Sequence, residues 1–207
     1  MKFFKPKFWD KKQISFYSII VFPISLLIQL LSYLKNITIK TKHYSIPVIC
    51  IGNIYLGGTG KTPLCIELYN ILKKLGKNPV FIRKKHNTYK DEKKLLEQIG
   101  SVYEDSNRIN ALENAIQNKF EIAIMDDGFQ DFSVKKDFSI ICFNEKQWIG
   151  NGLTIPSGPL REKLIALNRA NCVVINGKKN TNIENKILEK NKSINIFYTK
   201  YIAENIN

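Results

Sequence analysis

The most conspicuous feature of the hydrophobic pattern is an uncharged stretch of 22 residues, 13–34, near the start of the chain. As a helix rising ~1.5 Å per residue it would reach about 33 Å, enough to cross a hydrocarbon core of ~30 Å. One arc of its helical wheel, about 100° wide, is polar, and the remainder is Ile, Leu, Val and Phe. The polar positions are Ser15, Ser18, Ser25, Gln29 and Ser32.

The surroundings of this stretch distinguish three interpretations. Lysines flank it at both ends, without the asymmetry that orients a membrane-crossing helix. Pro23 interrupts the apolar run and no small-residue cleavage site follows, which argues against a signal peptide. We expect residues 1–45 to form an anchor in the membrane interface, with a single membrane span or a buried soluble helix as alternatives. Aromatic residues that suit an interfacial anchor precede the stretch: Phe3, Phe4, Phe8 and Trp9.

After residue 46, short runs rich in β-branched residues alternate with helical patterns. Such alternation predicts an α/β fold, with a mostly parallel sheet covered by helices on both faces. No linker or repeat divides this part, so we expect one domain over 46–207. The expected strands are 48–54, 80–83, 122–125, 140–143, 173–176 and 194–198, and the expected helices 62–75, 91–99, 106–118, 162–169 and 183–191.

Composition narrows the class of protein. The chain has 207 residues and 44% hydrophobic content, which excludes a wholly disordered chain. Its net charge of +14 would suit an anionic partner, but only four of the 32 basic residues are arginine, so A/T-rich coding is a competing cause. Residues 1–45 carry eight lysines and one aspartate, half of the net charge. The charge therefore indicates a membrane surface, and we expect no nucleic acid partner.

A glycine-rich turn after the first expected strand has the order of a phosphate-binding loop. It reads Gly57-Gly58-Thr59-Gly60-Lys61-Thr62, and a helical pattern follows. Glycines let backbone N–H groups face phosphate oxygens, Lys61 would reach the β- and γ-phosphates, and the Thr62 hydroxyl would ligate Mg²⁺. Tyr55 stands where the usual pattern has its first glycine. The expected nucleotide-binding residues are Leu56, Gly57, Gly58, Thr59, Gly60, Lys61, Thr62 and Pro63.

Two aspartates complete this motif. Asp126 and Asp127 end the expected strand at 122–125, where a Mg²⁺-associated Walker-B carboxylate belongs, so we expect at least one of them in that role. The alternative is that both only cap a turn into Gly128. Asn176-Gly177-Lys178-Lys179 lacks the aspartate of a guanine-binding motif, which favours ATP.

Three motifs in order resemble the tetraacyldisaccharide 4′-kinase family of Gram-negative bacteria. The third has no role in generic P-loop proteins, so the combination is specific. The motifs are Gly52-Asn53 with residues 57–63, then Asp126-Asp127-Gly128-Phe129-Gln130, and then Gly150-Asn151-Gly152 leading to Pro156-Ser157-Gly158-Pro159-Leu160-Arg161-Glu162.

The resemblance implies a reaction and a location. It implies Mg²⁺-dependent transfer of the ATP γ-phosphoryl group to the 4′-hydroxyl of a tetraacyl disaccharide 1-phosphate, a step of lipid A biosynthesis. The expected partners are this lipid A precursor and the lipid surface of the inner membrane. The expected location is the cytoplasmic face of that membrane, with peripheral or monotopic attachment.

The resemblance also implies roles for further residues. Asp91 would accept the hydroxyl proton, and Glu92 would join Asp126 and Asp127 near Mg²⁺. Without the resemblance, capping of the following helix is the simpler role for Asp91. Lys61 and Asp127 complete the expected catalytic set. Arg161 and Gln130 are expected to contact substrate, although an ion pair with a nearby carboxylate suits Arg161 equally.

Two departures from the family pattern leave alternatives open. Arg83 is followed by Lys84-Lys85-His86-Asn87 in place of a glycine-rich stretch. Family members also continue by roughly half this length again, into a second lobe whose histidine pairs with the catalytic aspartate. Neither His43 nor His86 occupies that place. The alternatives to an active lipid kinase are therefore an inactive fragment that binds nucleotide and membrane, and another ATP-dependent P-loop enzyme.

Overall fold

The computed structural model describes residues 5–11, 13–85 and 90–200, so Phe3, Phe4 and His86 lie outside the described residues. The chain separates into two compact units. Unit 1 comprises Met1–Thr38, Ile54–Thr59 and Cys142–Asn207, and unit 2 comprises Ile39–Asn53 and Gly60–Ile141. The division into an anchor at 1–45 and a kinase lobe at 46–207 stays a prediction.

Seven strands follow the hydrogen-bonded order β3-β2-β4-β1-β5-β6-β7. The ladders β1–β4, β1–β5, β2–β3, β2–β4 and β6–β7 are parallel, which confirms the predicted α/β class. The strands are β1 (Val48–Gly52), β2 (Pro79–Lys84), β3 (Val102–Asp105), β4 (Ile122–Asp126), β5 (Phe138–Asn144), β6 (Cys172–Asn176) and β7 (Asn195–Thr199).

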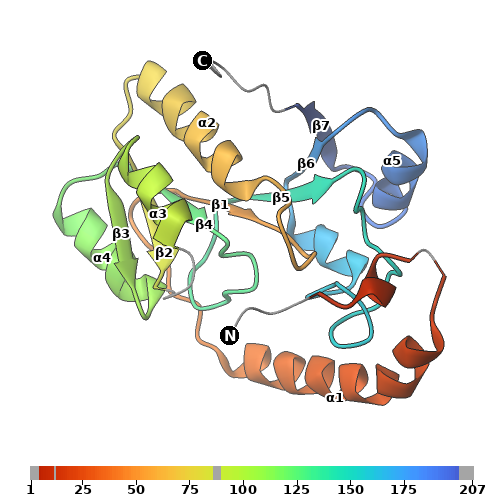
Figure 1. Ribbon diagram of the computed structural model, residues 1–207. Helices are drawn as coiled ribbons and strands as arrows, with labels where there is room; N and C mark the ends of the chain where they lie inside the picture. Colours follow the sequence, from red (N-terminus) through yellow and green to blue (C-terminus); the bar gives the residue numbers. More distant parts are fainter. Residues whose placement is uncertain (1–4, 12, 86–89, 201–207) are drawn as a thin grey trace. The chain divides into compact units, whose positions relative to one another are not determined.

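In unit 2, helices cover the strands that carry the site. The helix α2 (Lys61–Lys74) contacts β1, β2 and β4, and α4 (Arg108–Gln117) contacts β2 and β3 (Figure 1). The short α3 (Lys90–Glu97) contacts α2 and β3. The centres of β1, β2 and β4 are almost wholly buried, as expected for strands covered on both faces. The carboxyl ends of β1 and β4 lead into the glycine-rich loop and the paired aspartates.

The strand β3 was not expected from the sequence. Its four residues read Val-Tyr-Glu-Asp, are only partly buried and include one β-branched residue. It lies at the edge of the sheet, where the full apolar run of a central strand is not needed. Backbone pairing with β2 therefore forms this strand without a strong sequence signal.

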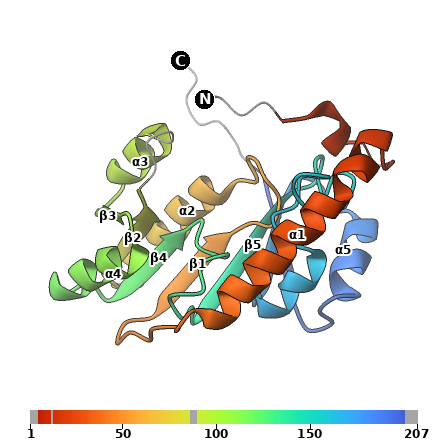
Figure 2. The same cartoon turned by 90° about the horizontal axis from the view of Figure 1, so that it is seen from below.

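Unit 1 contains the uncharged stretch, which forms one continuous helix through Pro23 (Figure 2). This helix, α1 (Phe16–Thr38), is the one described helix long and apolar enough to cross a membrane. The expected helix at 162–169 is instead a 3₁₀ helix that begins at residue 164. The other helical elements of this unit are η1 (Lys7–Trp9), η2 (Leu164–Arg169) and α5 (Thr181–Leu188).

The helix α1 turns its polar arc inward. Within it only Ser18 and Ser25 are buried, both 0% exposed, while its large apolar side chains are exposed. This arrangement does not fit the alternative of a buried soluble helix, whose apolar side would face the core. The expectation that Trp9 is an interfacial anchor is wrong, because its ring is buried and its Nε1–H donates to the Pro156 carbonyl at 2.9 Å.

Candidate phosphate-binding site

The glycine-rich loop joins β1 to α2 through backbone conformations that favour glycine. Gly57 has φ 147° and Gly60, immediately before the helix, has φ 91°. Side chains rarely adopt such angles, so a Cβ at Gly60 would strain the start of α2. Lys61, Thr62 and Pro63 then form the first turn of α2. The first N–H groups of a helix have no acceptor within it, which suits an anion beside this turn.

Tyr55 occupies the place of the missing glycine and is fully buried. Its hydroxyl donates to Asp10 Oδ1 at 2.7 Å and also contacts the Lys5 ammonium. Burial and the Asp10 carboxylate raise the pKa of Tyr55 above its usual value, so it stays a neutral donor. Tyr55 therefore fastens the start of the loop to the N-terminal segment of unit 1.

Within unit 2, Lys61 approaches the second aspartate after β4. Lys61 Nζ lies 3.7 Å from Asp127 Oδ1, and the Asp127 side chain is 35% exposed. Asp127 has φ 53°, a conformation that aspartate tolerates better than most residues, and its N–H donates to the Ile51 carbonyl at 2.9 Å. The backbone bond to β1 thus holds a partly exposed carboxylate beside the loop lysine.

Asp126 has different surroundings from its neighbour. Its carboxylate is buried, with Oδ2 3.2 Å from Arg83 Nε and Oδ1 3.7 Å from Cys65 Sγ. Burial raises the pKa of Asp126 above that of an ordinary aspartate, and the Arg83 guanidinium opposes that shift. Because both oxygens have protein partners, Asp126 is less available than Asp127 to a ligand.

Arg83 connects Asp126 to the first turn of α3. Its Nη2 lies 3.1 Å from Glu92 Oε2, and its side chain is buried. Glu92 is therefore linked through one guanidinium to Asp126. The expected places of both carboxylates near Mg²⁺ stay predictions. Asp91 is the second residue of α3 and is exposed, and the helix already begins at Lys90.

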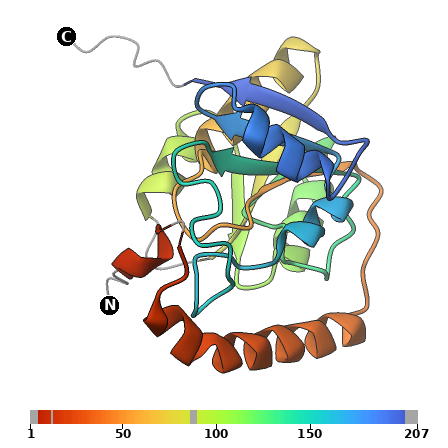
Figure 3. The same ribbon diagram turned by 90° about the vertical axis from the view of Figure 1, so that its right-hand side faces the viewer.

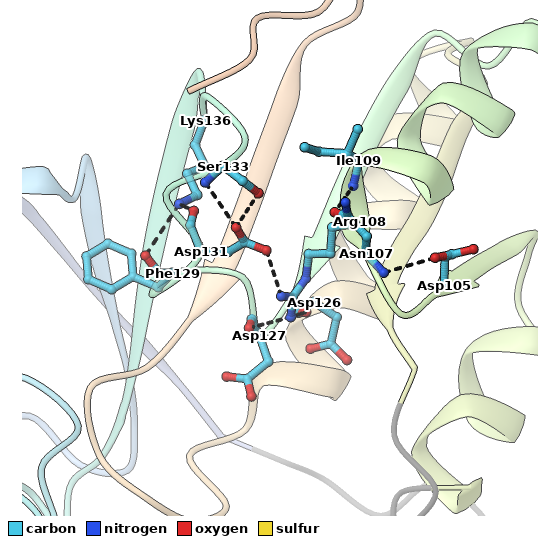
Figure 4. A network of polar contacts seen from close by, with 10 residues as sticks. All are labelled: Asp105, Asn107, Arg108, Ile109, Asp126, Asp127, Phe129, Asp131, Ser133 and Lys136. Atoms are coloured by element: carbon cyan, nitrogen blue, oxygen red, sulfur yellow. Dashed lines mark hydrogen bonds and ion pairs between the residues drawn. The ribbon is translucent and has the colours of Figure 1, made fainter. Parts of the chain in front are cut away.

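A second buried arginine holds the turn after β4, as Figure 4 shows. Arg108 Nη1 donates to Asp131 Oδ2 at 3.0 Å, and Nη2 donates to the carbonyls of Asp126 and Asp127 at 3.3 and 2.8 Å. Burial would raise the pKa of Asp131, but hydrogen bonds from Ser133 and the charge of Arg108 lower it below its usual value. An ionised Asp131 thus orients Arg108, and Arg108 fixes the backbone that carries both aspartates.

The two residues expected to contact substrate each donate a hydrogen bond to a backbone carbonyl. Gln130 Nε2 donates to the Asn53 carbonyl at 2.9 Å in unit 2. The Arg161 N–H donates to the Ile54 carbonyl at 2.7 Å in unit 1. The neighbouring Glu162 pairs with Arg169 at 2.7 Å. Substrate contact by Gln130 and Arg161 stays a prediction.

In unit 2 the structure thus brings Lys61 to Asp127, and Glu92 and Asp126 to the same Arg83 guanidinium, while Asp91 is exposed. Sequence reasoning missed Arg83 and Arg108 as parts of the site. One signal could have indicated them: arginine is rare in this lysine-rich chain, and its planar fork suits paired carboxylates and carbonyls better than lysine does.

Comparisons with known proteins identify the family of this chain. A family model described as tetraacyldisaccharide-1-P 4′-kinase matches residues 17–206. The tetraacyldisaccharide 4′-kinase of Pelagibacter ubique is 45% identical over 208 residues, covering all of this chain and 66% of the relative. The kinase of the same description from Rickettsia bellii is 34% identical over 178 residues, covering 78% of this chain and 55% of the relative.

A solved structure shares the fold. The LpxK of Aquifex aeolicus, crystallised in complex with ATP, matches with a TM-score of 0.65 at 20% identity, covering 89% of this chain and 82% of that one. The chain spans between about half and two thirds of the length of the curated relatives named above. Because the family model matches nearly the whole chain, we conclude that this chain belongs to the tetraacyldisaccharide 4′-kinase family.

Proposed function

We propose that this chain carries the nucleotide-binding part of a kinase that phosphorylates the 4′-hydroxyl of a tetraacyl disaccharide 1-phosphate in lipid A biosynthesis. The observation that carries the proposal is the approach of Lys61 to Asp127 at the start of α2, directly after the glycine-rich loop. Membership of the family supports the choice of reaction.

In this proposal residues 56–63 bind the ATP phosphates. The loop supplies backbone N–H groups, the first turn of α2 supplies partial positive charge, and Lys61 supplies a full charge to the β- and γ-phosphates. ATP rather than GTP is the proposed donor, because the segment at the end of β6, Asn176-Gly177-Lys178-Lys179, lacks a guanine-binding aspartate.

The residues fit a Mg²⁺ ion held mainly by substrate phosphates. Kinase sites typically use one or two carboxylates for this ion, and Thr62 with the partly exposed Asp127 provides such a set. In the described parts of the chain no three His, Cys, Asp or Glu side chains gather into a metal cluster. Bound Mg²⁺ would neutralise charge that develops on the phosphates. Asp126 and Glu92, both paired with Arg83, then orient the site around it.

For the acceptor hydroxyl, we retain Asp91 as the proton acceptor. Its exposure in the first turn of α3 leaves the carboxylate accessible to a substrate, and the adjacent Glu92 ties that turn to Arg83. Gln130 and Arg161 are the proposed substrate contacts. A chain that binds nucleotide and membrane but transfers nothing is the alternative, and product analysis distinguishes the two.

The nucleotide choice is testable by competition. We expect ATP to displace a fluorescent ATP analogue from the chain at roughly tenfold lower concentration than GTP, a difference of about 1.4 kcal/mol. The titration is made with and without Mg²⁺, and Mg²⁺ should tighten ATP binding. Equal displacement by GTP and ATP would contradict the proposed donor.

The proposed location is the cytoplasmic face of the inner membrane, with α1 lying in the interface. The exposed apolar side of α1 would enter the acyl region, and the lysines around it would face anionic headgroups. A lipid acceptor also requires the enzyme to work at a membrane surface.

A pair of charges on this apolar side tests the anchor. Leu27 and Leu31 are 56% and 57% exposed, and each leucine buried in lipid contributes roughly 1.5–3 kcal/mol. We expect Leu27→Asp with Leu31→Asp to lower co-sedimentation with phosphatidylethanolamine–phosphatidylglycerol vesicles by at least about tenfold. The control Leu75→Asp, at an exposed leucine just after α2, should bind vesicles like the wild type. Unchanged binding of the double variant would rule out this anchor.

A further inference from the structure

The polar arc of α1 faces its own unit at two buried serines. A helix that lies in a membrane interface and has no other contact keeps its polar side toward water. Here Ser18 and Ser25 are instead fully buried within unit 1, while the apolar side is exposed. Buried hydroxyls are costly unless they are hydrogen-bonded, so their partners show what the arc holds.

The partner of the arc is residues 151–161, which we call the connecting segment. Ser25 Oγ donates to the Thr154 carbonyl at 3.0 Å, lies 2.8 Å from Ser157 Oγ and accepts from the Ser157 N–H at 3.0 Å. The connecting segment lies along α1 (Figure 3). A single serine hydroxyl thus contacts this segment at three points.

Further bonds reinforce the same contact. Asn151 Nδ2 lies 3.2 Å from Ser18 Oγ and 2.9 Å from the Ser157 carbonyl oxygen. The Gln29 amide donates to the Thr154 hydroxyl, and the Asn151 N–H donates to the Trp9 carbonyl at 2.9 Å. The amino-terminal half of the connecting segment is therefore fixed to α1 by side chains and to η1 by a backbone hydrogen bond.

The other half of the connecting segment pairs with the start of the phosphate loop. The Leu56 N–H donates to the Pro159 carbonyl at 2.8 Å, and the Arg161 N–H donates to the Ile54 carbonyl at 2.7 Å. Tyr55 and Leu160 form an antiparallel bridge between these bonds. Only Gly158 separates Ser157 from this pairing, so the chain between the α1 contact and the loop is short.

We infer that the connecting segment couples α1 to the phosphate loop, and that Ser25 and Ser157 are positioning residues for nucleotide binding. The inference rests on the proposed function, since it takes residues 56–63 to bind ATP. A phosphate loop binds through backbone N–H groups, whose placement depends on how its ends are held. If the connecting segment is held less firmly, the phosphate loop samples more conformations. Binding of ATP must then restrict those conformations, which lowers the affinity for ATP.

The test removes one hydroxyl from α1. We expect Ser25→Ala to weaken binding of a fluorescent ATP analogue roughly three- to tenfold in detergent micelles, about 0.7–1.4 kcal/mol. Ser157→Ala should weaken binding less than Ser25→Ala, because the bonds of Ser25 Oγ to the Thr154 carbonyl and the Ser157 N–H remain. The double variant should bind like Ser25→Ala, because Ser25→Ala alone already removes the contact with the Ser157 hydroxyl. Ser157→Ala also keeps the inference testable if Ser25→Ala fails to fold.

Two controls separate positioning from general loss of stability. Asn191→Ala removes a side chain of the same unit that donates to the Leu167 carbonyl at 3.1 Å and accepts from the Ser193 N–H. It should lower Tm without changing nucleotide affinity. Ser32→Ala, at an exposed position of α1, should change neither.

The outcomes distinguish the inference from the proposal beneath it. If the wild-type chain binds nucleotide and Ser25→Ala and Ser157→Ala bind it equally well, the coupling is overturned while the proposed function stands. If the wild-type chain does not bind nucleotide, the proposed function fails and the inference fails with it.

Discussion

Replacing Lys61 by methionine should lower phosphate transfer by about 10²–10³-fold, the usual loss when a charge-stabilising donor is removed from an active site. Methionine keeps most of the length of the side chain but has no charge. It therefore removes the group beside Asp127 while leaving the fold of α2 intact. The expected losses are in both ATP affinity and transfer rate, because the γ-phosphoryl group gains charge interactions as it is transferred.

The matched control is another lysine of the same helix. Lys74→Met lies in the exposed last turn of α2 and should retain binding and transfer within about twofold. Isothermal titration with ATP and a radiolabelled transfer assay measure the two quantities. Transfer by Lys61→Met within a few-fold of the wild-type rate would show that this lysine does not serve the phosphates.

Replacing Arg83 by leucine should cost about 3–5 kcal/mol of folding free energy at neutral pH, as expected when one partner of a buried ion pair is removed. Asp126 would then be buried without a cation, and Glu92 would lose its link to it. Arg169→Leu is the matched control. It breaks a partly exposed pair with Glu162 and should cost under about 1 kcal/mol.

The loss at Arg83 should also depend on pH. Burial already raises the pKa of Asp126, and removing the guanidinium, which opposes that shift, raises it further. A carboxyl with a raised pKa in the folded state binds protons more readily there than in the unfolded state, so folded stability falls as pH rises. The destabilisation should therefore be smallest near pH 4, close to the unfolded pKa of aspartate, and increase toward pH 7. Urea unfolding followed by tryptophan fluorescence measures it. An equal loss at both pH values would contradict the assigned role of Arg83.

Features encoded locally were predictable from the sequence. The phosphate loop needs only a strand, positive-φ glycines and a helix start, and all lie within 48–63. The central strands were predictable from runs of β-branched residues, because both faces of these strands are buried. The partly exposed edge strand β3 carried no such run, and the expected helix at 162–169 is a 3₁₀ helix.

Features made by distant segments were not predictable in this way. The polar arc of α1 was visible, but Ser25 and its partner Ser157 are 132 positions apart. Likewise Arg83 lies in β2 without any local sign that Asp126 lies beside it. Tyr55 replaces the first glycine of the usual loop pattern. Its hydrogen bond to Asp10, 45 positions earlier, explains why a tyrosine stands there. The hydrophobic pattern of a sequence predicts which residues share one face of a helix or strand. It does not predict which distant segment packs against that face.

The proposed reaction is transfer of the ATP γ-phosphoryl group to the 4′-hydroxyl of a lipid disaccharide. The most direct measurement follows γ-labelled ATP into a tetraacyl disaccharide 1-phosphate in mixed micelles with Mg²⁺, and locates the new phosphate by tandem mass spectrometry. We expect label at the 4′ position, and we expect it to depend on Lys61 and Asp127. Binding of ATP and lipid without label in the product, or label at another hydroxyl, would contradict it.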